Sequence, residues 1–231
     1  MNQKITRKKY SFTEEQMADA FERRLLSRQP LDRIGRVNRV FREVDCHRGR
    51  PDFIGIISRM HSHSPIQHTP HNVATACVLS LLKSNSPRSL QSLTRSSHLT
   101  REVIAQSVRH LVTCGLVDET GTDLFTLSGG AAIFGIESIA FELKLTSPRR
   151  AVFQAQQYTL FAQQAWIVVP PPSVQGYDLY RPVLSRWGIG LATFDPKSHV
   201  FRTKLPAKRR PPISRQHQAY AMLRLVGNTA A

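Results

Sequence analysis

The stretch from residue 139 to residue 172 constrains the fold of this chain more than any other. Apolar residues alternate with other residues over positions 139–145, which predicts a strand with one buried face. Ser147-Pro148 interrupts that pattern, a helical run follows over residues 151–164, and a second apolar strand at 166–169 is stopped by three prolines. Strand, helix and strand within roughly 30 residues predict a βαβ unit, whose two strands are parallel.

Residues suited to chemistry lie on or near this unit. Glu142 and Lys144 are two positions apart on the first strand, so their side chains point to the same face. On the following helix, Gln154 and Tyr158 stand one turn apart. Upstream, Pro51-Asp52 directly precedes another apolar run, which we interpret as a further strand.

These fragments, in this order, resemble the PD-(D/E)xK nuclease superfamily, in particular its RecB-like and restriction-endonuclease-like members. The resemblance implies an α/β (α+β) fold in which a mixed sheet is flanked by helices. It also implies metal-dependent hydrolysis of phosphodiester bonds in DNA, with Mg²⁺ or Mn²⁺ as the cofactor. The residues that it assigns to the site are the metal ligands Asp52, Glu142 and the Leu143 backbone carbonyl, the catalytic cation Lys144, and the supporting residues Gln154 and Tyr158.

The chemistry of these residue types agrees with a metal site. Two carboxylates held close together repel each other and therefore recruit a divalent cation, and oxygen ligands favour Mg²⁺ or Mn²⁺ over zinc. A bound cation lowers the pKa of its water, while a neighbouring lysine stabilises charge on the phosphate. The competing interpretation of Glu142 and Lys144 is an ion pair on an ordinary half-exposed strand.

The pairing of Asp52 with Glu142 has an unusual spacing, because 89 residues lie between them. An insertion at the tip of a hairpin is tolerated, since the core contacts only its two ends. Glu137, five positions before Glu142, is nevertheless an alternative metal ligand. Glu43, on a predicted strand at residues 37–44, is a secondary candidate.

Residues 13–27 predict an amphipathic helix that Thr13 caps. In the resembled family, an acidic residue often projects from the helix that precedes the sheet. Glu15 or Glu22 would fill that role here, and the competing interpretation is a solvated helix face. Residues 1–10 are predicted to form a flexible basic arm.

Residues 69–128 differ from the flanking sequence and resemble a winged helix-turn-helix module. Helical stretches start at Thr69-Pro70, at Ser86-Pro87 and at Thr100, and a β-hairpin follows with its turn at Thr120-Gly121. In such modules the third helix enters the major groove. Its outward side chains here are Arg101, Gln106 and Arg109. Acidic residues of the hairpin favour a protein partner instead, and they are Asp118, Glu119 and Asp123.

The formal net charge of +16 indicates a polyanionic partner, and we expect DNA. Basic residues are dense in the proline-interrupted segment 203–215, which we predict to be extended along phosphates through Lys208, Arg209 and Arg210. Residues 216–226 are either a closing helix or an oligomerisation element, so a homodimer or a multi-subunit complex stays open.

Four histidines within residues 59–71 invite a metal-site interpretation. They have no cysteine or acidic partner in the segment and are separated by prolines, so we interpret the segment as a linker. The three cysteines lack metal-ligand spacing and predict a reducing compartment. With no apolar run of membrane-spanning length and no signal peptide, we expect a cytoplasmic protein without a membrane partner, associated with the nucleoid in a bacterium.

The predicted organisation is a discontinuous nuclease-like core at 1–58 and 129–200, an inserted winged helix at 69–128, and a basic tail at 201–231 with a possible C-terminal helix. The leading hypothesis is a metal-dependent DNA endonuclease in repair, transposition or defence against foreign DNA. The alternative is a non-enzymatic DNA-binding regulator or interaction subunit with an inactive nuclease-like fold. Five strands are predicted to share one mixed sheet: 37–44, 53–58, 139–145, 165–169 and 189–194.

Overall fold

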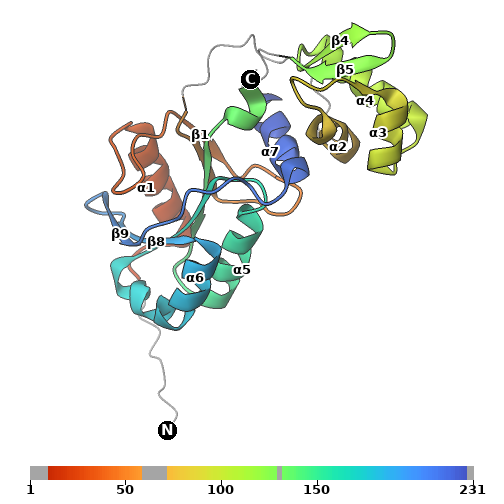
Figure 1. Cartoon of the computed structure of the whole chain (residues 1–231). Helices are drawn as coiled ribbons and strands as arrows, with labels where there is room; N and C mark the ends of the chain where they lie inside the picture. Colours follow the sequence, from red (N-terminus) through yellow and green to blue (C-terminus); the bar gives the residue numbers. More distant parts are fainter. Residues whose placement is uncertain (1–9, 59–71, 129–131, 228–231) are drawn as a thin grey trace.

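The computed structural model describes residues 10–58, 72–128 and 132–227. Within them, six strands form one mixed sheet in the order β1-β2-β6-β7-β8-β9 (Figure 1). β6, β7 and β8 are parallel, and the other neighbouring pairs are antiparallel. The strands are β1 (Arg39–Arg42), β2 (Phe53–Ile56), β6 (Ser138–Leu143), β7 (Gln164–Val169), β8 (Gly190–Asp195) and β9 (Val200–Leu205). The predicted mixed α/β sheet flanked by helices is confirmed, and it contains all five predicted strands.

The central strand β6 is buried on both faces, so the prediction of one buried face was wrong. On one face lies α1 (Glu14–Leu26), whose Phe21 ring is 5.1–5.8 Å, centroid to centroid, from the rings of Phe53, Phe141 and Phe194. The other face packs against α5 (Pro148–Tyr158) and α6 (Arg181–Trp187). Parallel strands need crossover connections, and these helices cover the face that the alternation pattern left polar.

Local chemistry sets where the first helix begins. The Thr13 side chain accepts a hydrogen bond from the Gln16 N–H at 3.1 Å, and the Gln16 side chain accepts one from the Thr13 N–H at 2.9 Å. This reciprocal capping box satisfies two amide groups that an uncapped helix leaves unpaired. The predicted cap at Thr13 is confirmed.

Residues 72–128, here called the lobe, form a unit with its own three-stranded sheet between β2 and β6 in the chain. Its elements are α2 (Val73–Leu81), β3 (Arg88–Ser89), α3 (Leu90–Ser97), α4 (Arg101–Thr113), β4 (Val117–Gly121) and β5 (Leu124–Leu127). The sheet order is β3-β5-β4. Three local predictions were wrong. The first helix, predicted to start at Thr69-Pro70, begins at Val73 and is capped by Asn72. The second helix begins at Leu90, because the chain first pairs as a short strand, and the hairpin turns after Gly121, at Asp123 with φ 57°.

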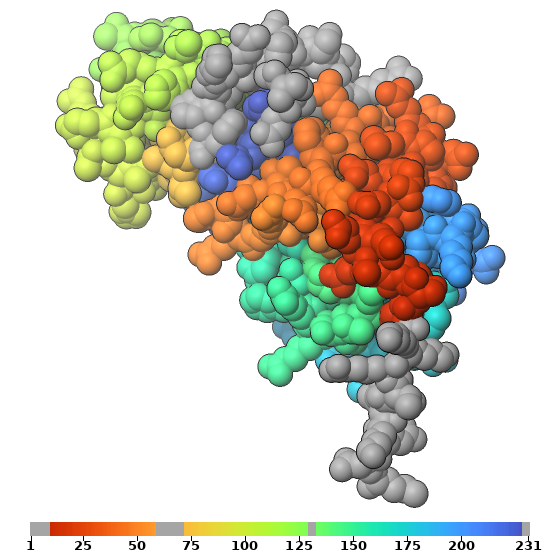
Figure 2. All heavy atoms as spheres, turned by 180° about the vertical axis from the view of Figure 1, so that it is seen from behind, coloured from red at the N-terminus to blue at the C-terminus, as the bar shows by residue number. Residues whose placement is uncertain are grey.

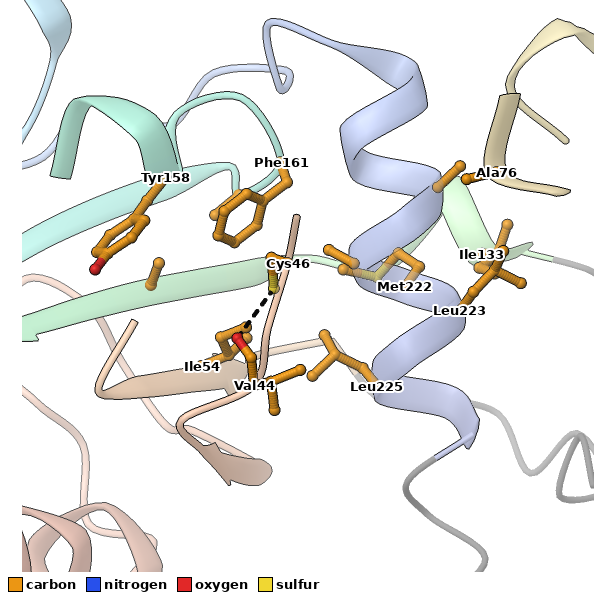
Figure 3. Close-up of a cluster of buried hydrophobic side chains, with 14 of the residues drawn as sticks. Val44, Cys46, Ile54, Ala76, Ile133, Tyr158, Phe161, Met222, Leu223 and Leu225 are labelled. Atoms are coloured by element: carbon orange, nitrogen blue, oxygen red, sulfur yellow. Dashed lines mark hydrogen bonds between the residues drawn. The ribbon is translucent and has the colours of Figure 1, made fainter. Parts of the chain in front are cut away.

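The C-terminal helix α7 (Arg215–Gly227) joins the lobe to the sheet. Seven of its residues are buried, and the helix packs against α2. In Figure 3, the α7 residues Met222, Leu223 and Leu225 have Val44 and Ile54 on one side. Ala76 of α2 lies on the other side. Arg215 adds a hydrogen bond of 2.9 Å to the Leu82 carbonyl. The helix therefore closes the fold rather than presenting a free apolar face.

Two further segments differ from the sequence-based expectations. Residues 200–205, which include the start of the expected tail, form the edge strand β9 against β8. The helix expected around residues 177–186 divides into a 3₁₀ helix, η2 (Pro171–Tyr180), followed directly by α6. Prolines at 171 and 172 begin η2, since proline fits the first turn of a helix and cannot extend the strand before it.

The lobe projects from one end of the molecule, as the view from behind shows in Figure 2. Residues 1–9 of the predicted basic arm and the histidine-rich segment at 59–71 lie outside the described residues, so their predicted roles stay predictions. None of the helices in the described part of the chain combines the length and apolar character that a membrane crossing requires.

Gly190 gives a direct test of the sheet packing. A methyl group at this position would lie 2.3 Å from Cε3 and 2.5 Å from Cδ2 of Trp166, its neighbour on β7, which is fully buried. We expect Gly190→Ala to destabilise the protein by about 1–3 kcal/mol, because the buried indole is closely packed. Chemical denaturation measures this loss. Gly121→Ala is the control, since its added methyl group meets nothing closer than 3.5 Å.

Candidate active site

Antiparallel pairing of β2 with β6 brings Asp52 beside Glu142. Phe53 lies opposite Phe141 in the register, so the residue before β2 meets the last residues of β6. Asp52 Oδ2 accepts a hydrogen bond from the Leu143 N–H at 2.6 Å. The 89 intervening residues therefore do not separate the two carboxylates, because the whole insertion leaves and re-enters at the far end of these strands.

Lys144, at the end of β6, forms ion pairs with the carboxyl groups of Glu142 and Glu14. Its Nζ lies 3.0 Å from Glu142 Oε1 and 2.8 Å from Glu14 Oε1. The second oxygen of Glu14 accepts a hydrogen bond from the Leu145 N–H at 3.2 Å. Glu14 was not among the predicted site residues, although the helix that carries it was predicted. Its signal was its place in the first turn of α1, at the end of the helix that meets the strand.

The α5 residues reach the same position from the opposite side of the strand pair. The Tyr158 hydroxyl donates a hydrogen bond to Glu142 Oε2, and both side chains are buried. Gln154 lies one helical turn earlier, and its Oε1 atom is buried without a hydrogen-bond partner. Tyr158, which the resemblance gives only as a supporting residue, is thus in direct contact with Glu142.

The Glu142 carboxyl is only 1% exposed, which rules out the interpretation as a surface ion pair. Burial, followed by the negative charge of Asp52, raises the pKa of Glu142 to about 7. Lys144 and the Tyr158 hydroxyl act in the opposite direction but do not outweigh these two effects. Although Lys144 Nζ is close to Glu142 Oε1, that oxygen lacks a hydrogen bond of acceptable geometry.

The pKa values of Asp52 and Lys144 are also shifted by burial and by the neighbouring charges. Burial raises the pKa of Asp52, and the hydrogen bond from Leu143 and the charge of Lys144 only partly offset it. Burial alone would lower the pKa of Lys144, but the hydrogen bond that it donates to Glu14 and the negative charges of Glu142 and Asp52 outweigh this effect, so its pKa is raised. Lys144 is therefore a permanent cation among three carboxyl groups, one of which sits near its titration point at neutral pH.

The other candidate carboxylates pair with arginine or are exposed. Glu43 nevertheless lies beside Asp52, whose carbonyl accepts a hydrogen bond from the Glu43 N–H at 3.1 Å. Glu43 pairs with Arg50 at 2.6 Å, and Glu22 pairs with Arg42 at 3.1 Å. Glu137 precedes β6 and pairs with Arg209 at 2.9 Å. It is five residues from Glu142, roughly 16 Å along the strand, so it lies at the opposite end and does not replace Asp52. Glu15 is exposed on α1.

The predicted DNA contacts form two exposed groups. Arg101, Gln106 and Arg109 are exposed on α4, as predicted. A groove beside them, between α3, the start of α4 and the β4–β5 turn, is lined by residues that include Gln91, Thr94, Arg95, Arg101 and Asp123. The second group comprises Lys208, Arg209 and Arg210, which follow β9 and are exposed.

The donor set fits a divalent cation held by oxygen atoms. Asp52 and Glu142 are adjacent carboxylates, and Glu142 Oε1 is buried with Lys144 Nζ 3.0 Å away. Among the residues that the structure describes, no three His, Cys, Asp or Glu side chains converge as a metal-binding group. Mg²⁺ is commonly bound by one or two carboxylates and several waters, so a ligand set of Asp52, Glu142 and the Leu143 carbonyl is compatible with Mg²⁺.

No protein-family model matches the chain, and no curated protein is significantly similar to it. The functional argument therefore depends on the geometry and electrostatics of the Asp52–Glu142–Lys144 cluster.

Glu142→Gln tests whether this cluster is an energetic cost to the folded protein. The folded-state pKa of Glu142, about 7, lies above its unfolded value, so wild-type stability falls as pH rises from about 4.5 to 7. In EDTA at pH 8, we expect Glu142→Gln to raise the free energy of unfolding by about 1–3 kcal/mol, with a smaller gain at pH 5.5.

Urea unfolding at both pH values measures this difference. Glu22→Gln is the control, because its partly exposed ion pair contributes about 0–1 kcal/mol. A Glu142→Gln protein less stable than the wild type at pH 8 would show that the ion pair with Lys144 outweighs the burial of charge.

Proposed function

We propose that this chain is a metal-dependent DNA endonuclease of the PD-(D/E)xK type, in which a winged-helix lobe assists DNA binding. The observation that carries the proposal is the convergence of Asp52, Glu142 and Lys144 at the ends of two adjacent strands. A buried carboxyl pair with a raised pKa destabilises the fold and is typical of functional sites. A catalytic role would explain why the protein has this destabilising carboxyl pair at the end of β6.

Asp52, Glu142 and the Leu143 carbonyl would hold Mg²⁺ or Mn²⁺. When bound, such a cation supplies a water of lowered pKa and neutralises charge on the scissile phosphate. Lys144 presents its ammonium group next to Glu142, where it stabilises negative charge that develops on the phosphate oxygens. Glu14 fixes the Lys144 ammonium, and Tyr158 fixes the Glu142 carboxyl, so both groups are oriented before the substrate arrives.

The order of the helices and strands in the lobe, together with its exposed arginines, supports the proposed role in DNA binding. Three helices and a three-stranded antiparallel sheet in the order β3-β5-β4 match the arrangement expected of a winged helix. The exposed face of α4 carries Arg101 and Arg109, and Arg95 extends that basic surface from α3. In a winged helix this face lies against DNA, where basic side chains contact phosphates or base edges.

Lys144→Ala tests the catalytic assignment. We expect cleavage of plasmid DNA with Mg²⁺ to fall by at least about 10²-fold, because the charge that opposes the developing phosphate charge is lost. The DNA dissociation constant should change less than about twofold, since Lys144 is one of 32 basic residues and is largely buried. Lys204→Ala, which removes the same charge from the exposed strand β9, is the matched control.

Asp52→Asn belongs to the same experiment and tests the partner of Glu142 across the insertion. Full activity in Asp52→Asn would remove Asp52 from the site. Wild-type protein that cleaves no supercoiled, linear or single-stranded DNA with Mg²⁺ or Mn²⁺ would overturn the endonuclease proposal and favour the DNA-binding regulator.

Removing Arg101 and Arg109 together tests the role of the lobe. If both contact phosphates, Arg101→Ala with Arg109→Ala should reduce the slope of log K against log salt by about 2. The control is Arg23→Ala with Arg39→Ala, which removes equal charge from exposed positions on α1 and β1. Fluorescence anisotropy over a salt series measures both variants. Equal slopes for the two double variants would assign the lobe to another partner.

A further inference from the structure

The C-terminal end of α6 carries an exposed tryptophan. Trp187 is 39% exposed, whereas Trp166, the other tryptophan of the chain, is fully buried. Val183 lies one helical turn earlier on the same face of α6 and is also exposed. Single exposed apolar side chains are ordinary on protein surfaces, so the indole by itself indicates no function. The residues around the indole decide whether it belongs to a binding site.

The segment that follows β9 is fixed beside this end of α6. The Lys208 N–H donates a hydrogen bond of 2.9 Å to the Gly188 carbonyl. A methyl group added at Gly188 would lie 3.0 Å from Cβ of Lys208 and 3.4 Å from Cζ of Arg210. The Arg210 guanidinium also donates a hydrogen bond of 3.4 Å to the Arg186 carbonyl. Lys208 and Arg210 therefore lie against the helix end that carries Trp187.

The surface around the indole is positively charged. Its exposed cations are Arg186, Lys208 and Arg210. None of the ion pairs among the described residues involves these three side chains, whereas Arg209 pairs with Glu137 at 2.9 Å. The sequence contains no Asp or Glu at positions 179–194 or 196–231. A negatively charged partner therefore meets no repulsion from these segments.

An indole among cations suits a nucleic-acid strand with unpaired bases. The face of an indole stacks on any nucleobase, while guanidinium and ammonium groups contact the flanking phosphates. In a duplex, neighbouring base pairs cover the base faces, so a side chain in a groove reaches only base edges. An acidic protein segment would supply negative charge but no base to stack on the indole. The combination therefore favours a single strand over a duplex or an acidic protein.

This patch lies away from the carboxyl cluster. Gly188 comes before β8, and Glu137, the partner of Arg209, comes before β6. Because β6, β7 and β8 are parallel, the patch is at the N-terminal end of these strands. Glu142 is near the C-terminal end of β6, roughly 16 Å along the strand from Glu137. The patch is therefore separate from the candidate active site.

We propose that Trp187, Arg186, Lys208 and Arg210 form a binding site for single-stranded DNA. One base stacks on the indole, and the three cations contact phosphates on either side of it. This inference goes beyond the proposed function, from which it takes only that the polyanion is DNA. Such a site holds an unpaired strand at the end of the sheet opposite the carboxyl cluster.

Intrinsic fluorescence tests the stacking directly, because Trp166 is fully buried and Trp187 is exposed. In EDTA, we expect a short oligothymidine to quench the exposed emission, and a blunt duplex of equal length to quench it far less. Trp187→Leu should abolish the quenching and weaken oligothymidine binding about tenfold, measured by anisotropy of labelled DNA. Trp187→Phe is the matched control, since it loses the emission but keeps an aromatic face and hence most of the affinity.

Arg210→Ala tests the phosphate contacts. The slope of log K against log salt for oligothymidine should decrease by about 0.7, the value for one phosphate contact on a single strand. Arg23→Ala removes the same charge from an exposed position on α1, on the other face of the sheet, and should leave the slope unchanged.

The outcomes separate this inference from the proposed function. Wild-type oligothymidine affinity in Trp187→Leu, or equal quenching by duplex and single strand, would overturn the inference. Tighter binding of oligouridine than of oligothymidine would assign the patch to RNA and overturn it as well. If Trp187→Leu fails to fold, quenching of the wild type and the slope of Arg210→Ala still decide. Because every measurement is made in EDTA, failure to cleave DNA overturns the nuclease proposal alone.

Discussion

Burial of the Glu142 carboxyl beside Asp52 is the constraint on which the local structure depends. A carboxylate with 1% exposure is destabilising unless charges and hydrogen bonds surround it. Three elements supply them, because α1 brings Glu14 to Lys144, α5 brings the Tyr158 hydroxyl, and η2 covers the end of the strand. Each group is held by an element that also packs on the sheet, so the fold itself orients the cluster.

The inserted lobe leaves this cluster intact because it joins the sheet at the other end. The chain departs after β2 and returns before β6, where the Ile57 N–H donates a hydrogen bond of 3.0 Å to the Glu137 carbonyl. Asp52 and Glu142 lie at the opposite end of these two strands. An insertion there adds only the entropy of closing a longer loop, which grows slowly with length.

The lobe nevertheless shares a hydrophobic core with the main sheet. Buried residues of α2 and α4 belong to the same apolar cluster as Ile54 and Ile167 of the sheet, and α7 supplies the contacts between them (Figure 3). This continuity ties the orientation of the lobe to the sheet. The exposed basic face of α4 and the carboxyl cluster at the end of β6 therefore belong to one packed body.

The sequence by itself determined five of the six strands of the main sheet, because alternation and apolar runs bounded by proline are local signals. It also marked Asp52, Glu142, Lys144 and Tyr158. It missed β9, whose alternation is masked by basic side chains, and it could not tell that helices bury both faces of β6. Glu14 was missed because neighbours in sequence do not show where a helix end meets a strand. Packing decided which carboxylate joins Lys144, because only the folded sheet places residues 14, 52 and 142 together.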